Sequence, residues 1–406
     1  MAELAINGGS KVRTGGWPSW PVWDECETSK VVEAVESGQW GRLAEESLCG
    51  DFEQKFAEYQ DAEYGVVVTS GTAALTIALK AVGVDVGDEV IVPPYTFIAS
   101  ATSVLQNNAV PVFVDVDIET RNMDPDAVEA AITDRTTAIM PVHFSGRACD
   151  MDRLMDIADR HNLAVIEDAC HSWGAEWNGT KMGALGDIGA VSFQSSKHIT
   201  CGEGGIILTN DEELAGRAYS YHHIGRIPGR PFYEHHLCGW NFRMNEVSAA
   251  MLLCQFERLD EQTQRRHENG LYLDDKLGGI EGIIPLRREP YMTRIARHVF
   301  GVRFDEQVMG VSRDRFRDAL AAEGIPNGTG YPHPLYKNPL FAEQRFGRIK
   351  KFVDYPDYGS MYLENSERLC DELIVLSQQM LLADKSDMDD IVEAFHKVAD
   401  NRAELQ

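Results

Sequence analysis

The sequence lacks the features that mark several classes of protein. No apolar run reaches the roughly 20 residues that a membrane-spanning helix needs, and residues 1–16 lack the apolar stretch of a secretory signal. Basic residues are few, because 38 lysines and arginines stand against 64 aspartates and glutamates, for a net charge of −26. Such a charge repels nucleic acid and anionic membranes. We therefore expect a cytoplasmic protein with no nucleic-acid partner and no membrane partner.

Cysteines are scattered, and two ligand signatures are missing. The eight cysteines form no CxxC pair and show no metal-ligand spacing, and a chain of 406 residues is long enough to bury a core without disulfides. We expect reduced thiols and no metal site. No GxGxxG motif is present, and GALGDIG at residues 183–189 has the wrong spacing for a dinucleotide turn. The sequence therefore does not suggest NAD.

What the chain does have, from about residue 65 to 210, is an alternation of short apolar runs and helical patterns. The apolar runs are YGVVV, EVIVP, VPVFVDV, TAIMPVH, LAVIED, GAVSF and GGIILT. Helical spacing covers residues 72–82, 97–107, 125–132 and 151–161. This alternation is typical of an α/β fold with a parallel sheet covered by helices.

A long helical pattern at residues 245–276 becomes strongly charged toward its end, which indicates that this end leaves the core. We place the domain transition there. The expected division is a large domain of residues 1–255, which includes an N-terminal segment, and a smaller C-terminal α+β domain of residues 256–406.

Within the C-terminal part, residues 298–304 predict a strand, and residues 313–323 and 387–398 predict helices. Residues 327–358 are rich in proline, glycine and aromatic side chains and show no clear period. They predict a long ordered loop, and such loops often carry function.

The first candidate site is TSGTAAL, residues 69–75, where an apolar run leads through Ser-Gly-Thr into a helical pattern. Free N–H groups and the helix dipole at such a turn attract an anion. Gly71 permits close backbone approach, and the Ser70 and Thr72 hydroxyls add donors. The segment fits a phosphate, although serine and threonine also make an ordinary helix N-cap here.

The second candidate site is VIEDACHSWG, residues 165–174, where Glu167 and Asp168 end an apolar strand. The carboxyl ends of strands are where open α/β sheets bind ligands. A carboxylate beneath a pyridine nitrogen keeps that nitrogen protonated, so that the ring can act as an electron sink. Asp168 is the candidate, and a capping or loop acid is the alternative. His171 could contact the same ring or be a structural histidine.

The third candidate site is SFQSSKHITCGEGG, residues 192–205, with Lys197 between two apolar strands. A lysine taken at random is a solvated surface charge. Desolvation at this position would lower the pKa of its amine and make it available as a nucleophile. The GEGG that follows lacks the GK[ST] ending of a nucleotide phosphate loop, so the segment favours an imine-forming lysine.

Together and in this order, the three segments resemble the sugar aminotransferases of the DegT type, within the fold-type I enzymes that depend on pyridoxal 5'-phosphate (PLP). The resemblance continues through VVEAVESGQWGR, GDEVIVPPYTFIAS, PVHFSG and GWNFRMNE and covers nearly the whole chain. It implies a three-layer large domain with a mainly parallel sheet. It also implies PLP as cofactor, an amino-acid donor and a keto-sugar or keto-cyclitol acceptor.

The resemblance assigns roles to single residues. Lys197 would form the Schiff base with PLP, and Asp168 would pair with the pyridine nitrogen. The phosphate and ring contacts would come from Ser70, Gly71, Thr72, Ser192 and Phe97. Asn241, in GWNFRM, would reach the phosphate across a dimer interface, which would make a homodimer obligatory.

The acceptor side depends on residues 222–236 and 329–341, which resemble the loops that line the acceptor pocket of the family. Tyr331, His333 and Tyr336 are the candidates, unless they only order the loop. SFQSSK, GWNFRM and the YP.PLY loop resemble most the enzymes of scyllo-inosose, related cyclitols or aminoshikimate-type precursors, often with L-glutamine rather than L-glutamate as donor.

Three alternatives remain open. One is an aminotransferase for nucleotide-linked keto-hexoses. The other two belong to different classes: a regulatory protein that binds PLP without turnover, and a nucleotide-binding module on the same sheet.

Overall fold

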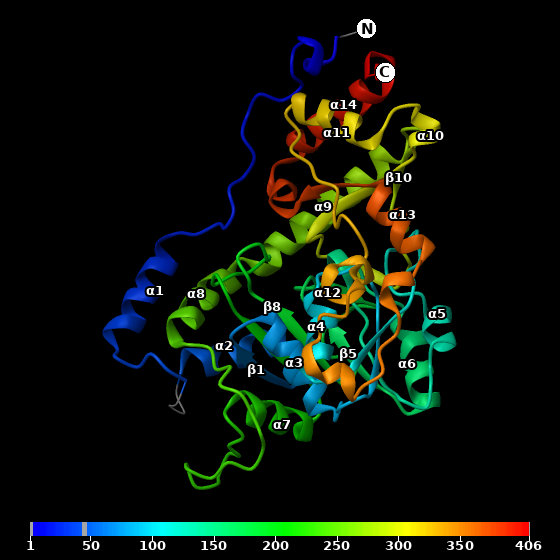
Figure 1. Ribbon diagram of the computed structural model, residues 1–406. Helices are drawn as coiled ribbons and strands as arrows, with labels where there is room; N and C mark the ends of the chain where they lie inside the picture. The colour runs from blue at the N-terminus through cyan, green and yellow to red at the C-terminus, as the bar shows by residue number, and fades with distance from the viewer. Residues whose placement is uncertain (1–2, 43–46, 406) are drawn as a thin grey trace.

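The computed structural model describes residues 3–42 and 47–405 (Figure 1). At its centre is a seven-stranded sheet of order β1-β9-β8-β5-β4-β2-β3. The strands are β1 (Tyr64–Val68), β2 (Glu89–Val92), β3 (Val110–Phe113), β4 (Thr136–Ile139), β5 (Ala164–Asp168), β8 (Ile188–Ser192) and β9 (Gly205–Thr209). Only β9 runs antiparallel to its neighbours. The predicted α/β fold with a mainly parallel sheet is confirmed.

Helices cover both faces of this sheet, which makes three layers (Figure 1). The covering helices are α2 (Leu48–Tyr59), α3 (Gly71–Ala81), α4 (Ala99–Gln106), α5 (Pro125–Ala130), α6 (Met151–His161), α7 (Glu212–His222) and α8 (Glu246–Glu257). Side chains alternate between the faces along a strand. Val66 and Val68 therefore pack with α3, whereas Val67 packs with α2 and α8 on the other face.

The prediction of a single helix at residues 245–276 is wrong in one respect. It is divided at Arg258 into α8 and α9 (Leu259–Leu277). Arg258 turns its guanidinium to Asp24 and Glu27 on the N-terminal side of the molecule. The two helices pack on different cores, α8 on the large sheet and α9 on the second sheet, and the break accommodates this change of partner.

The second sheet is antiparallel, in the order β10-β12-β13. It consists of β10 (Ile283–Pro285), β12 (Val299–Phe304) and β13 (Leu373–Ser377), and it packs with α9, α11 (Arg313–Ala322) and α14 (Lys385–Asp400). β12, α11 and α14 agree with the predicted strand and helices. The sequence interpretation missed β13, α13 (Glu364–Glu372) and the N-terminal α1 (Glu25–Glu36).

The two hydrophobic cores do not follow the chain order strictly. Leu4 is buried in the core of the second sheet, and its backbone N–H donates to Glu404 near the C-terminus, so the two ends of the chain lie together (Figure 1). Conversely, Leu335, Tyr336 and Phe341 of the predicted ordered loop are buried against the large sheet. The division at residue 255 stays a prediction, with these two segments crossing it.

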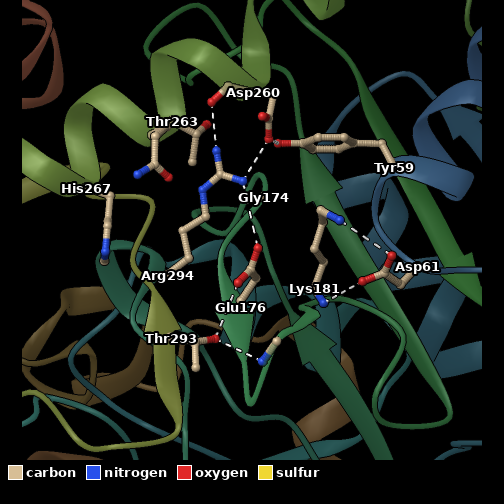
Figure 2. Close-up of polar contacts among 12 residues, drawn as sticks. Tyr59, Asp61, Gly174, Glu176, Lys181, Asp260, Thr263, His267, Thr293 and Arg294 are labelled. Atoms are coloured by element: carbon tan, nitrogen blue, oxygen red, sulfur yellow. Dashed lines mark hydrogen bonds and ion pairs between the residues drawn. The ribbon is translucent and has the colours of Figure 1, made fainter.

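A small sheet, β11 (Met292–Arg294), β6 (Glu176–Trp177) and β7 (Thr180–Lys181), joins the two parts of the fold. Figure 2 shows its polar contacts. Arg294 donates to the carboxylate and to the carbonyl of Asp260 at the start of α9, both at 2.7 Å, and the Tyr59 hydroxyl donates to the same carboxylate at 3.1 Å. This network connects α2, α9 and the small sheet.

The expectation that all thiols are reduced is wrong for one pair. Cys26 on α1 and Cys254 on α8 form a disulfide, with their Cα atoms 5.8 Å apart. The pair is 228 residues apart in sequence, and α1 packs along α8, a tertiary contact that cysteine spacing cannot show. The other six cysteines are free. None of the helices formed by residues 3–42 and 47–405 has the length and apolar character needed to cross a membrane.

Candidate active site

A cavity of about 930 Å³ opens where the carboxyl ends of β5 and β8 meet the start of α3. Of the twelve predicted site residues, nine line it: Ser70, Gly71, Thr72, Phe97, Asp168, His171, Ser192, Lys197 and Tyr331. They come from five separate segments of the sequence. The fold therefore brings the three candidate motifs to one place.

The Ser-Gly-Thr segment begins α3 at the cavity wall. Ser70 is the N-cap, and its Oγ accepts from the backbone N–H of Ala73 at 3.1 Å, so the capping alternative is realised as well. A Cβ added to Gly71 would lie 2.7 Å from Cβ of Ser192. Only glycine lets α3 start this close to the end of β8. The resulting wall of hydroxyls and free N–H groups fits a phosphate.

Asp168 is the last residue of β5 and is 5% exposed. Its Oδ2 accepts from Ser100 Oγ at 2.7 Å, and its Oδ1 accepts from the backbone N–H of Cys170 at 3.2 Å. Hydrogen bonds to an ionised carboxylate favour the charged form. Ser100 supports the site from α4, and no sequence pattern singled it out.

Glu167, the neighbour of Asp168, faces away from the cavity into the fold. It is fully buried and accepts from His143 Nε2 at 2.9 Å and from the backbone N–H groups of Gly183, Leu185 and Gly186. Burial alone would raise the pKa of Glu167, but His143 and these donors hold it below its ordinary value. The two adjacent acids therefore have different functions, and Glu167 has a structural one.

Lys197 lies in the turn after β8, with its backbone N–H donating to the carbonyl of Gln194 at 2.8 Å. Its Nζ is 5.8 Å from the ring centroid of Trp173. Burial lowers the pKa of the Lys197 amine from its ordinary value, while Cys170 and Asp168 act in the opposite direction. The amine is thus more easily deprotonated than that of a surface lysine.

Two stacked histidines form the wall beside Lys197. The rings of His171 and His298 are 4.3 Å apart, and Nδ1 of His171 accepts from the backbone N–H of Ser145 at 3.3 Å. Burial, with the charge of Lys197, lowers the pKa of both imidazoles well below the ordinary value, so both are neutral near pH 7. His298 lines the cavity from the C-terminal half, a contact that no motif in the sequence indicated.

The three candidates of the acceptor loop lie in different environments. Tyr331 lines the cavity, with its ring 5.4 Å from Tyr95 and 5.8 Å from Phe144. Tyr336 is wholly buried in the core of the large sheet, and its hydroxyl donates to Glu367 at 2.8 Å. The prediction that Tyr336 lines the acceptor pocket is therefore wrong. Its side chain is buried in the core, where it orders the loop. His333 does not line the cavity of its own chain either.

Asn241 also lies away from the cavity of its own chain. It is exposed and forms an antiparallel bridge with His223. Phe97 lines the cavity, yet 57% of its surface is exposed. Both positions are compatible with a site that a second chain completes.

The DegT/DnrJ/EryC1/StrS aminotransferase family model matches residues 22–396. The chain belongs to this family. It is a PLP-dependent aminotransferase, and the family resemblance seen in its motifs is confirmed. The cavity fits PLP, since it combines a phosphate-binding helix start, a buried carboxylate and a desolvated lysine.

Curated relatives are similar to this chain over its full length, and two of them illustrate this similarity. The L-glutamine:scyllo-inosose aminotransferase of Streptomyces griseus is 38% identical, over 100% of this chain and 99% of the relative. The L-glutamine:2-deoxy-scyllo-inosose aminotransferase of Micromonospora echinospora is also 38% identical, over 100% of both chains.

Solved structures of aminotransferases have the same fold. The crystal structure of 3-amino-5-hydroxybenzoic acid synthase superposes with a TM-score of 0.86 at 34% identity and covers 96% of this chain and 100% of its own. NtdA of Bacillus subtilis, solved with its bound cofactor PMP, superposes with a TM-score of 0.79 at 26% identity, over 93% of this chain and 82% of its own.

Proposed function

We propose that this aminotransferase transfers the amino group of L-glutamine to the ketone of a cyclitol of the scyllo-inosose type. The observation that carries the proposal is the single cavity in which Lys197, Asp168 and the start of α3 meet. Full-length relatives named for L-glutamine and for scyllo-inosose or its 2-deoxy derivative support the choice of donor and acceptor.

Lys197 is the residue we assign to covalent and proton-transfer work. Bound PLP supplies an electron sink for the carbanion that forms when an amino acid loses its Cα proton. The lowered pKa of Lys197 makes its unprotonated amine available for bond formation with a carbonyl carbon. The same Nζ, once free, removes the proton from Cα of the donor. In the reaction with the acceptor, it delivers a proton to the carbon that gains the amino group.

The remaining cavity residues hold and orient the cofactor. Asp168, fixed by Ser100 and the N–H of Cys170, would accept a hydrogen bond from the pyridine nitrogen. The phosphate would lie at the start of α3. The donors there are Ser70, Gly71, Thr72 and Ser192. Phe97 would stack on one face of the ring, and His171, neutral and held by Ser145, would contact it.

A homodimer with shared sites is part of the proposal. Asn241 lies outside its own cavity, where it could reach the phosphate bound by a partner chain. Several large apolar side chains are exposed in one chain, among them Phe97, Trp40 at 59% and Tyr233 at 86%. We propose that the partner chain covers these side chains. We keep a cytoplasmic location as a prediction.

The test is a two-stage assay of the purified protein loaded with PLP. In the first stage, the absorption spectrum is recorded before and after adding L-glutamine or L-glutamate, and the proposal expects conversion to the pyridoxamine form with L-glutamine. In the second stage, scyllo-inosose, 2-deoxy-scyllo-inosose and a nucleotide-linked 4-keto-hexose are each supplied as acceptor.

The outcomes separate the alternatives. Recovery of the PLP spectrum with a cyclitol ketone supports the proposal. Recovery with the nucleotide-linked sugar alone would identify that sugar, and not a cyclitol, as the acceptor. A protein that binds PLP and converts no donor would be the regulatory alternative. A protein that binds no PLP would contradict the whole assignment.

A further inference from the structure

Three arginines and one aspartate, whose charges act on one another, are buried behind the wall of the active site. This arginine cluster consists of Arg121, Arg147, Arg297 and Asp274, and its arginines are only 2%, 1% and 2% exposed. Arg121 follows β3, Arg147 follows the turn of Phe144, Arg297 precedes β12, and Asp274 is on α9. The cluster therefore joins both hydrophobic parts of the fold.

The charges in the cluster do not balance. Arg297 donates to Oδ2 of Asp274, and Arg147 donates through Nη2 to the carbonyls of Leu286 and Arg287. Within residues 3–42 and 47–405, no carboxylate other than Asp274 forms an ion pair with any of the three arginines. Three guanidinium charges thus face one carboxylate in the interior.

Many polar atoms of the cluster also lack a hydrogen-bond partner among the described residues. They are Nε and Nη1 of Arg121, Nε and Nη1 of Arg147, Nε of Arg297 and Oδ1 of Asp274. Buried polar groups are nearly always paired in folded proteins, and buried charges are paired or neutralised. Five unpaired donor atoms on three buried arginines whose charges act on one another therefore indicate an acceptor that is not part of the chain.

The guanidiniums of Arg121 and Arg147 remain charged near neutral pH. Burial is the main cause that lowers the pKa of Arg121 to about 10 and that of Arg147 to about 9, and the charge of Arg297 adds to both shifts. Even these lowered values lie above 7. The sequence also leaves space for the charges, since a Cβ on Gly301 would lie 3.0 Å from Nη1 of Arg121.

We propose that the arginine cluster binds one small inorganic anion, a halide such as chloride, between Arg121, Arg147 and Arg297. The ligand is small and monatomic because the arginines are almost completely enclosed, which leaves no opening for an organic substrate. A monovalent anion balances one of the two excess charges and accepts from several unpaired N–H groups.

The bound anion stabilises the wall of the active site. Arg121 lies 5.3 Å from the ring centroid of Phe144, which lines the cavity, and Arg297 immediately precedes His298, which stacks on His171. A ligand held by both arginines fixes two parts of this wall relative to each other. Anion binding at this cluster does not depend on the identity of the amino donor or of the acceptor.

The first test compares thermal unfolding in sodium chloride and in sodium gluconate at equal ionic strength. A ligand that binds only the native state raises Tm with concentration. We expect Tm in chloride to exceed Tm in gluconate by about 2 °C or more, with saturation. Equal Tm values in the two salts at every concentration would overturn the proposal.

The matched variants separate a site from a general salt effect. Arg147→Met removes one of the three cations and should lose the difference between the two salts. Arg348→Met removes an exposed arginine and should keep the difference. If the Tm difference between chloride and gluconate were the same in both variants and in the unchanged protein, it would be an effect of bulk solvent and would contradict a binding site.

A second measurement uses the unchanged protein and does not depend on whether Arg147→Met folds. Crystals soaked in sodium bromide should show an anomalous peak among the three guanidiniums. Water alone at this position, with no anomalous signal, would refute anion binding.

Discussion

The two ends of the active-site cavity are constructed by different means. At the cofactor end, Asp168 ends β5, and Ser70 and Lys197 lie in the turns that follow β1 and β8. Backbone N–H groups and a hydroxyl hold Ser70 and Asp168 in place. At the aromatic end, Tyr95, Phe144 and Tyr331 meet edge to face, and their positions depend on side-chain packing. This end adjoins the cofactor residues, since the ring of Phe144 lies 5.5 Å from that of His171.

This difference predicts which changes affect the chemistry and which affect the choice of acceptor. Groups fixed by the sheet keep their places when a neighbour is altered, so substitutions there should remove a chemical function without loss of the fold. Aromatic walls adapt more easily, and substitutions there should alter acceptor binding and leave the reaction with the donor unchanged.

Lys197→Ala should have the largest effect. The variant loses both the covalent link and the group that transfers the proton, and general acid–base catalysis alone accounts for about 10²–10⁴ in rate. We expect a loss of at least about 10⁴-fold in the reaction with L-glutamine, measured by stopped-flow absorbance. Lys181→Ala, which removes a lysine paired with Asp61 outside the cavity, is the control. A near-native rate for Lys197→Ala would show that another residue does this work.

Asp168→Asn should come next. The amide preserves the shape of the side chain but removes the charge that keeps the pyridine nitrogen protonated. We expect PLP to remain bound through the phosphate contacts while the rate with L-glutamine falls by about 10²–10³-fold. Ser100→Ala, which leaves the carboxylate charge in place, should cost about 10-fold or less. Equal losses in both variants would mean that position, and not charge, is what matters.

Glu167→Gln should reduce stability rather than catalysis, although Glu167 is adjacent to Asp168 in sequence. Removing one partner of the buried pair with His143 costs about 3 kcal/mol of unfolding free energy. Denaturant unfolding measures this loss. A variant of native stability with a defective donor reaction would contradict the division between the two acids.

The same pair predicts how stability depends on pH. The pKa of Glu167 is lowered from 4.5 in the fold, so its contribution is full above about pH 4.5 and is lost as the pH falls through the lowered value. Nδ1 of His143 accepts from the backbone N–H of Cys149 at 3.2 Å, so the imidazole is neutral and donates through Nε2 to Glu167. Unfolding curves between about pH 6 and pH 3 should show a decline that Glu167→Gln lacks.

The sequence predicted the cofactor end well, and the reason is local. Each of its motifs lies at the end of an apolar run, and the carboxyl ends of parallel strands meet at one edge. Once the runs of β1, β5 and β8 were recognised, the meeting of Ser70, Asp168 and Lys197 followed from topology.

The other end depends on contacts that no local pattern contains. His298 reaches the wall from beyond the predicted domain transition, and the segment with Tyr336 packs back on the large sheet. Tyr331 and Tyr336 occur in the same YP.PLY loop, five positions apart, yet one lines the cavity and the other is core. Similarly, the pairing of Cys26 with Cys254 and the break at Arg258 follow from how α1 and α8 pack.

The two tyrosines provide the last and smallest test of the contrast. Tyr331→Phe removes a hydroxyl at the cavity and should raise KM for the cyclitol acceptor by about 10-fold, with no change in the reaction with L-glutamine. Tyr336→Phe removes the hydrogen bond to Glu367 and should lower the free energy of unfolding by about 1 kcal/mol at unchanged KM. Steady-state kinetics with varied acceptor and denaturant unfolding measure the two effects. The opposite result would contradict the contrast. If Tyr331→Phe changed only stability while Tyr336→Phe changed KM, the acceptor would not bind at the aromatic end. A buried core hydroxyl such as that of Tyr336 can change acceptor affinity only by moving the loop.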